Sequence, residues 1–298
     1  MTTTTSAKVI ADSQFGDTRL ITLEVELHRF ILAQNNTHKA QSRNIQSSRA
    51  IPVLRQLEQI ANDPAMPIYY GKKQSGMVAD EELSPEEIEE CKKIILWMRD
   101  CCVMGVEKLH KVGLQKEVAN RYVEPWMWTK GVVTATETAW KEMFKLRCHY
   151  AAQAEIKALF EAIEKAISDS TPSKLKAGDL HLPYYGKQGV YGEQERSVGL
   201  NKEDAVSISL SCVAQVSYRK LDDSLEKAES VVEMLNLPKK GVFPKDPPHF
   251  SPTEHIAIAV DKEKFDTDKE LSGNFHSEDF VQYRKLLEHG IEDVYIKE

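Results

Sequence analysis

The sequence lacks the features that mark several large classes of protein. No apolar run reaches the roughly 18 residues of a membrane-spanning helix, and the polar residues 1–5 show neither the charged nor the apolar region of a secretory signal. We therefore expect a cytoplasmic protein without membrane association. The formal net charge of -7 disfavours a protein that coats a nucleic-acid polymer, because such a protein needs a basic surface.

Common enzyme motifs are also missing. The sequence contains no G-x-G-x-x-G, G-x-x-x-x-G-K-[ST], H-E-x-x-H or G-x-S-x-G segment, which excludes the most frequent nucleotide folds, metalloproteases and serine hydrolases. The 5 cysteines are odd in number and have no paired metal-type spacing, so we expect reduced structural thiols and no metal centre. With 298 residues, 41% hydrophobic and 29% charged, the chain should form one large domain or two ordinary ones.

A polar run at residues 34–49 is the best candidate for a binding site. It follows a predicted strand at residues 20–27, where apolar and polar residues alternate, and it precedes a predicted helix at residues 53–60. Loops at strand ends often carry binding groups, and the basic residues, hydroxyls and amides of this run would suit a phosphate group. The alternative interpretation is a plain solvated loop.

A long helix is predicted to begin after Ser84, where Pro85 and Glu87 complete an N-terminal capping signal. Apolar residues then recur at alternating spacings of three and four up to Gly113. We expect this helix to pack along its length against other helices, or across a subunit boundary. Its apolar seam consists of Ile88, Cys91, Ile95, Met98, Cys102, Gly105 and Leu109.

The rest of the sequence predicts further helices and one more strand. A loop at residues 64–76 is long enough to act as a lid, and a polar stretch at residues 171–173 marks the best subdomain boundary. The predicted helices cover residues 116–123, 134–147, 151–167, 204–217, 221–235 and 277–287, and the predicted strand covers residues 256–260.

Several residues of the polar run stand at the spacing Q-x-x-R-H-R-x-x-S-x-N-E-x-S-x-R, which is the signature of flavin-dependent thymidylate synthases. The chain resembles this family at two further motifs, in family order. Residues 116–121 resemble its R-E-x-A-R segment, and Leu146 and Arg147 with residues 152–157 resemble its L-R…A-Q-x-E-I-R helix pair. The matching residues of the polar run are Gln34, His38, Lys39, Ser42, Asn44, Ser47 and Arg49.

Two more segments resemble family motifs but occur out of order. Residues 214–218 are similar to A-R-V-S-Y, and residues 249–255 are similar to H-x-[ST]-P-F-E-H. In the family both precede the signature, whereas here both follow it, which a circular permutation would explain. Residues 1–170 would then carry the signature and a helical region, and residues 171–298 would be the permuted segment that completes the same fold. The alternative for residues 251–254 is a simple helix capping box.

The resemblance implies an α+β fold, with a mostly antiparallel sheet flanked by long helices, in a homotetramer whose sites are shared between subunits. It also implies that bound FAD is reduced by NADPH, that methylenetetrahydrofolate supplies the one-carbon unit, and that dUMP becomes dTMP without an enzyme cysteine as nucleophile. The protein would contribute positioning and electrostatics.

By the same resemblance, the nucleotide would be held by Gln34, Ser47, Arg49, Arg121 and Arg147, of which Arg147 and Ser47 would take part in catalysis. FAD would be bound by His38, Lys39, Ser42, Asn44, Ser217, His249, Ser251 and Glu254. Each residue also has a purely structural alternative, such as a helix-terminal charge for Arg147 or a surface histidine for His38.

Some positions depart from the family pattern. Thr37 and Lys39 replace arginines of the signature, and Ile45 replaces its glutamate. A diverged binding site is therefore implied. Two alternative hypotheses follow: a related one-carbon transfer, such as hydroxymethylation or the use of dCMP, and a nucleotide-binding or assembly protein without catalysis.

Overall fold

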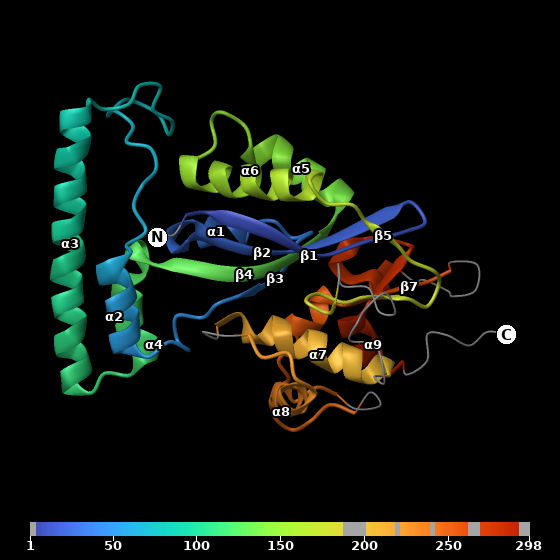
Figure 1. Cartoon of the computed structure of the whole chain (residues 1–298). Coiled ribbons are helices and arrows are strands. Elements are labelled where there is room, and N and C mark those ends of the chain that lie inside the picture. The colour runs from blue at the N-terminus through green and yellow to red at the C-terminus, as the bar shows by residue number, and fades with distance from the viewer. Residues whose placement is uncertain (1–3, 187–200, 218–220, 239–241, 262–268, 292–298) are drawn as a thin grey trace.

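The protein is built around a five-stranded mixed sheet. The computed structural model describes residues 4–186, 201–217, 221–238, 242–261 and 269–291. The strand order of the large sheet is β3-β4-β2-β1-β5, and a second sheet has the order β6-β7-β8. Helices α5 and α6 cover one face of the large sheet, and α7, α8 and α9 lie on the other side with the small sheet (Figure 1).

A long hairpin forms the centre of the large sheet. β1 (Ser6–Phe15) and β2 (Thr18–His28) pair antiparallel, and Gly16, with φ 53°, takes the left-handed conformation in the turn between them. β4 (Trp128–Thr136) pairs antiparallel with β2 and with β3 (Ser42–Ile45), whereas the short β5 (Ser173–Lys174) pairs parallel with β1.

The first face of the sheet is closed by α5 (Glu137–Arg147) and α6 (Ala154–Ser168). Leu23 and Val133 of the sheet belong to one buried cluster with Trp140 of α5 and Phe160 of α6. Each such side chain contributes about 1.5–3 kcal/mol when it is fully buried. This packing fixes the end of α5, where Arg147 stands.

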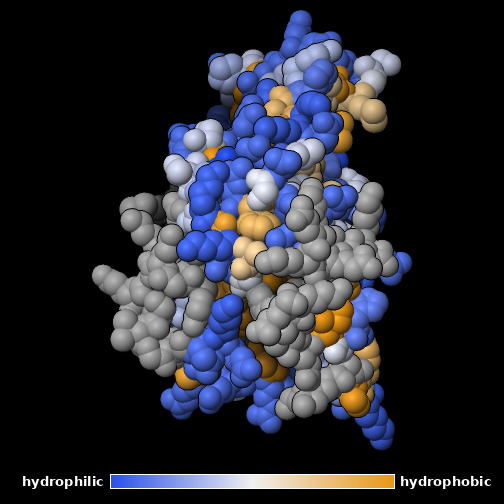
Figure 2. All heavy atoms as spheres, turned by 90° about the vertical axis from the view of Figure 1, so that its right-hand side faces the viewer, coloured by the Kyte–Doolittle hydropathy of each residue, from blue (hydrophilic) through white to orange (hydrophobic). Residues whose placement is uncertain are grey.

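The second face is closed by the C-terminal part of the chain. α7 (Lys202–Ala214) packs on α8 (Leu225–Leu235), and the 3-10 helix η6 (Ser251–His255) contacts β3 and β4. The small sheet consists of β6 (Leu180–His181), β7 (Ala257–Ala259) and β8 (Phe280–Gln282), followed by α9 (Tyr283–His289). Apart from β5, which is an edge strand of the large sheet, the described residues beyond position 171 therefore close this second face. Among the described residues on the side of the molecule that carries β7 and α9, hydrophilic side chains predominate, with apolar patches near the centre and toward the lower right (Figure 2).

A helical arm stands at the far end of the sheet (Figure 1). α3 (Pro85–Val112) begins with the predicted capping box of Ser84 and Glu87 and ends at Gly113, whose φ of 97° is left-handed. α3 packs beside α2 (Val53–Asn62), α4 (Lys116–Ala119) and the 3-10 helix η2 (Asn120–Trp126). Among the described helices, none combines the length and hydrophobicity that a membrane crossing requires.

The predicted seam of α3 is only partly buried. Ile95 and Cys102 pack on the cluster formed with α2 and η2, and Val106 is buried there. Met98 of the seam is exposed, however, and so are Trp97 and other apolar side chains beside it. The prediction that this helix packs along its whole length is therefore wrong for one chain alone.

Several element predictions also needed correction. β1 was not predicted, and residues 134–136, expected to be helical, end β4 before α5 begins at Glu137. The final helix begins at Tyr283, because residues 280–282 form a strand. The polar run is not a plain loop either. It includes the end of α1 (Leu32–Asn35) and all of β3, whose polar side chains meet polar groups of distant segments.

Candidate functional site

The fold separates the predicted site residues into three clusters along the polar run. We call them the His38 cluster, the Asn44 cluster and the Glu124 cluster, after a central residue of each. Their residues in the polar run come before β3, on β3 and after β3, respectively.

The His38 cluster joins the polar run to the end of α5. Nε of Arg147 donates to Nε2 of His38 over 2.9 Å, and NH2 of Arg147 donates to Oγ1 of Thr37 over 3.2 Å. A guanidinium can only donate, so Nε2 of His38 must be an unprotonated acceptor, and the ring proton is on Nδ1. Burial, together with the charges of Arg147 and Arg43, lowers the pKa of His38 to about 4. His38 is therefore a neutral hydrogen-bond donor at physiological pH.

A chain of side chains extends from the same cluster into α6. Nε2 of Gln34 donates to Oε1 of Gln153 over 2.6 Å, and Nε2 of Gln153 donates to Oε2 of Glu155 over 2.9 Å. Glu155 is buried, and its other oxygen accepts from the backbone N–H of Ile68 over 3.1 Å. The orientation of Gln34 is thus tied to a buried carboxylate.

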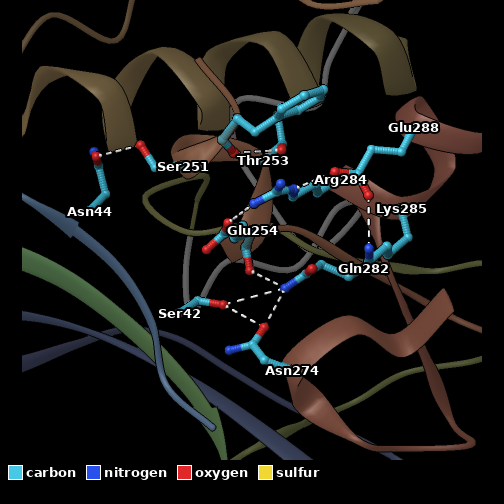
Figure 3. Close-up of polar contacts among 11 residues, drawn as sticks. Ser42, Asn44, Ser251, Thr253, Glu254, Asn274, Gln282, Arg284, Lys285 and Glu288 are labelled. Atoms are coloured by element: carbon cyan, nitrogen blue, oxygen red, sulfur yellow. Dashed lines mark hydrogen bonds and ion pairs between the residues drawn. The ribbon is translucent and has the colours of Figure 1, made fainter. Parts of the chain in front are cut away.

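The Asn44 cluster joins β3 to segments more than 150 residues away (Figure 3). Oδ1 of Asn44 accepts from Oγ of Ser251 over 3.0 Å, and Nδ2 of Asn44 donates to the carbonyl of Val213 over 2.7 Å. The buried Ser42 donates to Oδ1 of Asn274 over 3.0 Å. The structure therefore brings together Ser42, Asn44 and Ser251, which the resemblance predicts to lie in one site.

Glu254 is part of the same cluster, but its carboxylate faces another protein group. It forms an ion pair with Arg284 of α9, and Arg284 also donates to Oε1 of Glu288 over 2.7 Å. The guanidinium of Arg284 lies 5.0 Å from the centre of the Phe250 ring. Gln282 donates to the Glu254 carbonyl over 3.0 Å (Figure 3). Sequence reasoning missed Arg284 and Gln282, because neither belongs to a motif.

The Glu124 cluster lies on η2. Oε1 of Glu124 accepts from Oγ of Ser48 over 2.7 Å, from NH1 of Arg121 over 2.8 Å and from NH2 of Arg29 over 3.2 Å. Ser47 accepts from the backbone N–H of Arg49 over 3.3 Å, and the side chain of Arg49 is exposed. Ser48 and Arg121 therefore share the Glu124 carboxylate, with Ser47 and Arg49 on either side of Ser48 in the chain, while Glu124 and Ser48 were not anticipated.

The remaining predicted residues contribute less to these clusters. Lys39 and His249 are exposed, and the backbone N–H of His249 donates to the Leu235 carbonyl over 2.9 Å. The backbone of Ser217 belongs to the 3-10 helix η5 (Gln215–Ser217). Its side chain, and the Tyr218 of the motif at residues 214–218, lie outside the described residues.

Two cavities of the described chain lie elsewhere. One, of about 530 Å³, is lined by residues of β1, the end of α6 and Tyr184. The other, of about 430 Å³, is lined by residues at the ends of α2, α3 and α4. Neither is lined by a predicted site residue. Within the described ranges, no group of three or more His, Cys, Asp or Glu side chains is arranged to hold a metal ion.

Together these features define an α+β protein with a mixed sheet, in which the polar run contacts Arg147 at the end of α5 and Ser251 of η6. Residues 17–173, just over half of the chain, match the family model of the thymidylate synthase complementing protein, Thy1. The chain belongs to this family. Membership of this family supports the assignment of the chain as a nucleotide methyltransferase. No curated protein sequence matches the chain.

Solved structures also resemble the chain over about half its length. The UMP/dUMP methylase PolB from Streptomyces cacaoi bound with 5-Br UMP is 17% identical, with a TM-score of 0.44, covering 51% of this chain and 69% of that chain. Its 5-Br dUMP complex is 18% identical, with a TM-score of 0.43 and coverages of 51% and 67%. Thymidylate Synthase X from Helicobacter pylori with FAD and dUMP is 16% identical, with a TM-score of 0.35 and coverages of 50% and 67%.

Proposed function

We propose that the protein is a flavin-dependent thymidylate synthase, which methylates dUMP to dTMP with methylenetetrahydrofolate and NADPH. The observation that carries this proposal is the contact of Arg147 with His38, because it joins two family motifs that are 109 residues apart. A guanidinium beside a set of amides and hydroxyls suits a nucleotide phosphate or ring carbonyl, which it can bind in two places at once.

The described residues also fit part of a flavin site. The neutral His38 offers an N–H donor and the exposed Lys39 an ammonium group, and both suit the phosphate or carbonyl oxygens of FAD. Asn44 is near His38 in the sequence and accepts from Ser251, but Ser42 is buried and Glu254 is paired with Arg284. We therefore assign His38 and Lys39 the direct contacts, with the Asn44 cluster supporting β3. When bound, FAD supplies the redox chemistry of the reaction.

We also propose a homotetramer, because neither of the two cavities noted above in the described part of the chain is lined by residues of the three clusters. The exposed apolar residues of α3 offer a surface on which a second copy can pack. Assembly would allow the His38 cluster of one copy and the Glu124 cluster of another to bind the same nucleotide.

A circular permutation remains part of the proposal. The contacts of η6 and η5 with β3 support it, because they bring residues after position 213 against the signature run. On this view, residues 171–298 perform the task of the segment that precedes the signature in other family members, within one structural domain.

The test is a spectrum and an activity assay on the purified chain. We expect a yellow protein that takes up FAD and releases tritium from dUMP labelled at carbon 5 when NADPH and methylenetetrahydrofolate are present. A colourless protein that binds neither FAD nor dUMP would contradict the proposal.

A second candidate is a related one-carbon transfer with another product or pyrimidine. Ile45 favours it, because this residue replaces the signature glutamate with an apolar side chain that packs against the core cluster under α5 and α6. Mass analysis of the product decides: a hydroxymethylated product, or turnover of dCMP, supports this candidate, and dTMP alone supports the first. Tight nucleotide binding without any turnover would instead indicate a non-catalytic homologue.

A further inference from the structure

Five polar side chains form one buried hydrogen-bonded chain between the large sheet and the C-terminal part of the molecule. Thr22 of β2 and Thr134 of β4 bond to each other over 2.7 Å. Thr22 also bonds to Nε2 of His181 over 2.7 Å, and Thr134 bonds to Nδ1 of His255 over 2.8 Å. Nδ1 of His181 bonds to Ser13 over 2.9 Å. All of these residues are 0% exposed, and nothing in the proposed reaction gives them a task.

The number of protons in the middle of this chain is fixed. Three hydrogen bonds lie between the two rings, and each of them needs one proton. The two threonine hydroxyls supply one proton each, so one, and only one, of the facing ring nitrogens carries the third. If both rings are protonated, four protons face three bonds, and one hydroxyl proton has no acceptor in the chain. The chain therefore suits two neutral rings and not two charged ones.

The charged groups near the two rings do not offset an added proton. Asp12 of β1 favours a proton on His181, but Arg19 binds both oxygens of this carboxylate, over 2.9 and 2.7 Å. For His255, the nearby charge is that of a protonated His181, which is unfavourable. Burial outweighs these charges and lowers the pKa of both rings to about 3. Three more carboxylates on neighbouring elements are also engaged: Asp179 by the backbone of Lys176, Glu254 by Arg284, and Asp279 by Thr18.

Both rings belong to a part of the molecule that has a hydrophobic core of its own. One buried cluster consists only of residues from position 180 onward, whereas the cluster under α5 and α6 contains no residue beyond position 167. We call the described residues between 180 and 291 the C-terminal layer. Besides the polar chain, two smaller apolar clusters and several hydrogen bonds hold this layer on the sheet. Parts with separate cores and a partly polar contact can separate before either part unfolds.

We propose that the chain from Ser13 to His255 is an acid-sensitive latch, which holds the C-terminal layer on the sheet. Protonation of the rings puts charge into a buried contact and a surplus proton into the chain, so the latch opens. The C-terminal layer then turns away from the sheet about residues 175–180, while α5 and α6 stay packed on the other face. This opening does not depend on which ligand the protein binds.

Two neighbouring residues of β4 can report the opening, because they face opposite sides of the sheet. Val132 packs with Val213 of the C-terminal layer, whereas Val133 packs under α5 and α6. Both valines are at most 1% exposed. The thiol of Val132→Cys should react with a maleimide when the latch opens, and the thiol of Val133→Cys only when the α5–α6 face unfolds. The exposed Cys101 serves in every sample as the reference for the reactivity of a free thiol.

The labelling rate relative to Cys101 is measured by mass spectrometry between pH 7 and pH 5. Below about pH 6.5, the rate at Val132→Cys should rise by up to about tenfold per pH unit for each ring that gains a proton on opening. The rate at Val133→Cys should remain much lower at each pH. Tryptophan emission, which reports only positions 97–140, should stay native while the Val132→Cys thiol becomes reactive.

Two further substitutions separate the latch from the core. Thr22→Val breaks the chain in its middle, so it should raise the rate at Val132→Cys by about tenfold at pH 7. Ile163→Val weakens the core under α6, so it should raise the rate at Val133→Cys but leave the rate at Val132→Cys within about twofold.

Either of two results would overturn the latch. Equal labelling of Val132→Cys and Val133→Cys under all of these conditions would show that the two faces of the sheet open as one unit. A rate at Val132→Cys that does not change between pH 6.5 and pH 5 would show that the buried rings do not control the contact.

Discussion

Arg147 holds His38 through a hydrogen bond of 2.9 Å between Nε and Nε2, and this contact makes His38 a neutral ring with its proton on Nδ1. The contact thereby links the position of Arg147 to the protonation of His38, although the two residues belong to different motifs. The arginine is kept in place at the end of α5, and the histidine cannot take a second proton without losing its partner.

The titration of His38 should show this contact directly. Because burial and the charge of Arg147 both lower the pKa of His38, nuclear magnetic resonance should find it near the value of about 4. Arg147→Gln removes the positive neighbour, so the pKa should rise toward the ordinary value of about 6.5. The exposed Arg49→Gln is the matched control and should leave it unchanged. A wild-type His38 that titrates near 6.5 would refute the contact.

Activity should depend on the several N–H donors of the Arg147 guanidinium more than on its charge. Lysine keeps the charge but cannot bind His38, Thr37 and a ligand oxygen together. If the chain forms dTMP as proposed, we expect Arg147→Lys and Arg147→Gln each to lower the rate by about 10²–10³, as is typical for loss of one electrostatic group. Lys145→Gln, on the exposed side of the same helix, should remain within about threefold of the wild type. Full activity of Arg147→Lys would show that only the charge is needed.

Stability should fall in mild acid because of two buried histidines. Thr22 and Thr134 bond to each other over 2.7 Å and link His181, at 2.7 Å, to His255, at 2.8 Å. Burial lowers the pKa of both histidines to about 3. Between the unfolded pKa of about 6.5 and the folded value, the unfolded state binds more protons. Folding stability is therefore complete above pH 6.5 and is lost as the pH falls toward 3.

The slope of this loss can be measured with urea at pH 7, 6 and 5. Each buried histidine should contribute about 1.4 kcal/mol per pH unit below 6.5. His181→Gln should lower the free energy of unfolding at pH 7. It should also remove about half of the pH dependence that His181 and His255 together contribute. An unchanged slope in this variant would mean that another group controls the acid response.

The sequence predicted some of these features well and others not at all. The ends of α3 follow from Ser84, Glu87 and Gly113, because caps are local chemistry that any helix start or stop displays. Arg147 was singled out as a site residue because its motif is also local. These signals depend on a few neighbouring residues, and they do not require knowledge of the fold.

Other features depend on partners that are distant in sequence. β3 reads as a loop because its polar side chains are satisfied by Val213, Ser251 and Asn274, which no local pattern connects to it. Arg284 is likewise invisible until the fold places it beside Glu254. The reason is physical: a buried hydrogen bond between distant segments leaves no periodicity in the sequence.

Ile45 can be tested through its neighbour Gly131. A Cβ atom added to Gly131 would lie 2.3 Å from Cδ1 of Ile45, so Gly131→Ala should lower the free energy of unfolding by about 1–2 kcal/mol. Ile45→Val removes that methyl group at a cost of about 0.5–1.5 kcal/mol. In the double variant, the loss of free energy of unfolding, measured with urea, should be clearly smaller than the sum of the two single losses. Strict additivity would show that the two side chains do not compete for the same space.

The exposed face of α3 gives the last prediction. Trp97 is 65% exposed and Met98 48% exposed, so neither contributes much to the stability of one chain. If copies assemble through α3, Trp97→Glu places a charge in the interface and should convert the tetramer into a species that sediments more slowly. The thermal midpoint of the dissociated chain should be unchanged. Leu54→Glu, at an exposed apolar position on α2, is the matched control and should leave the sedimentation unchanged. A wild-type chain that sediments as a monomer would contradict the assembly, and the His38 and Glu124 clusters would then have to act on one nucleotide within a single copy.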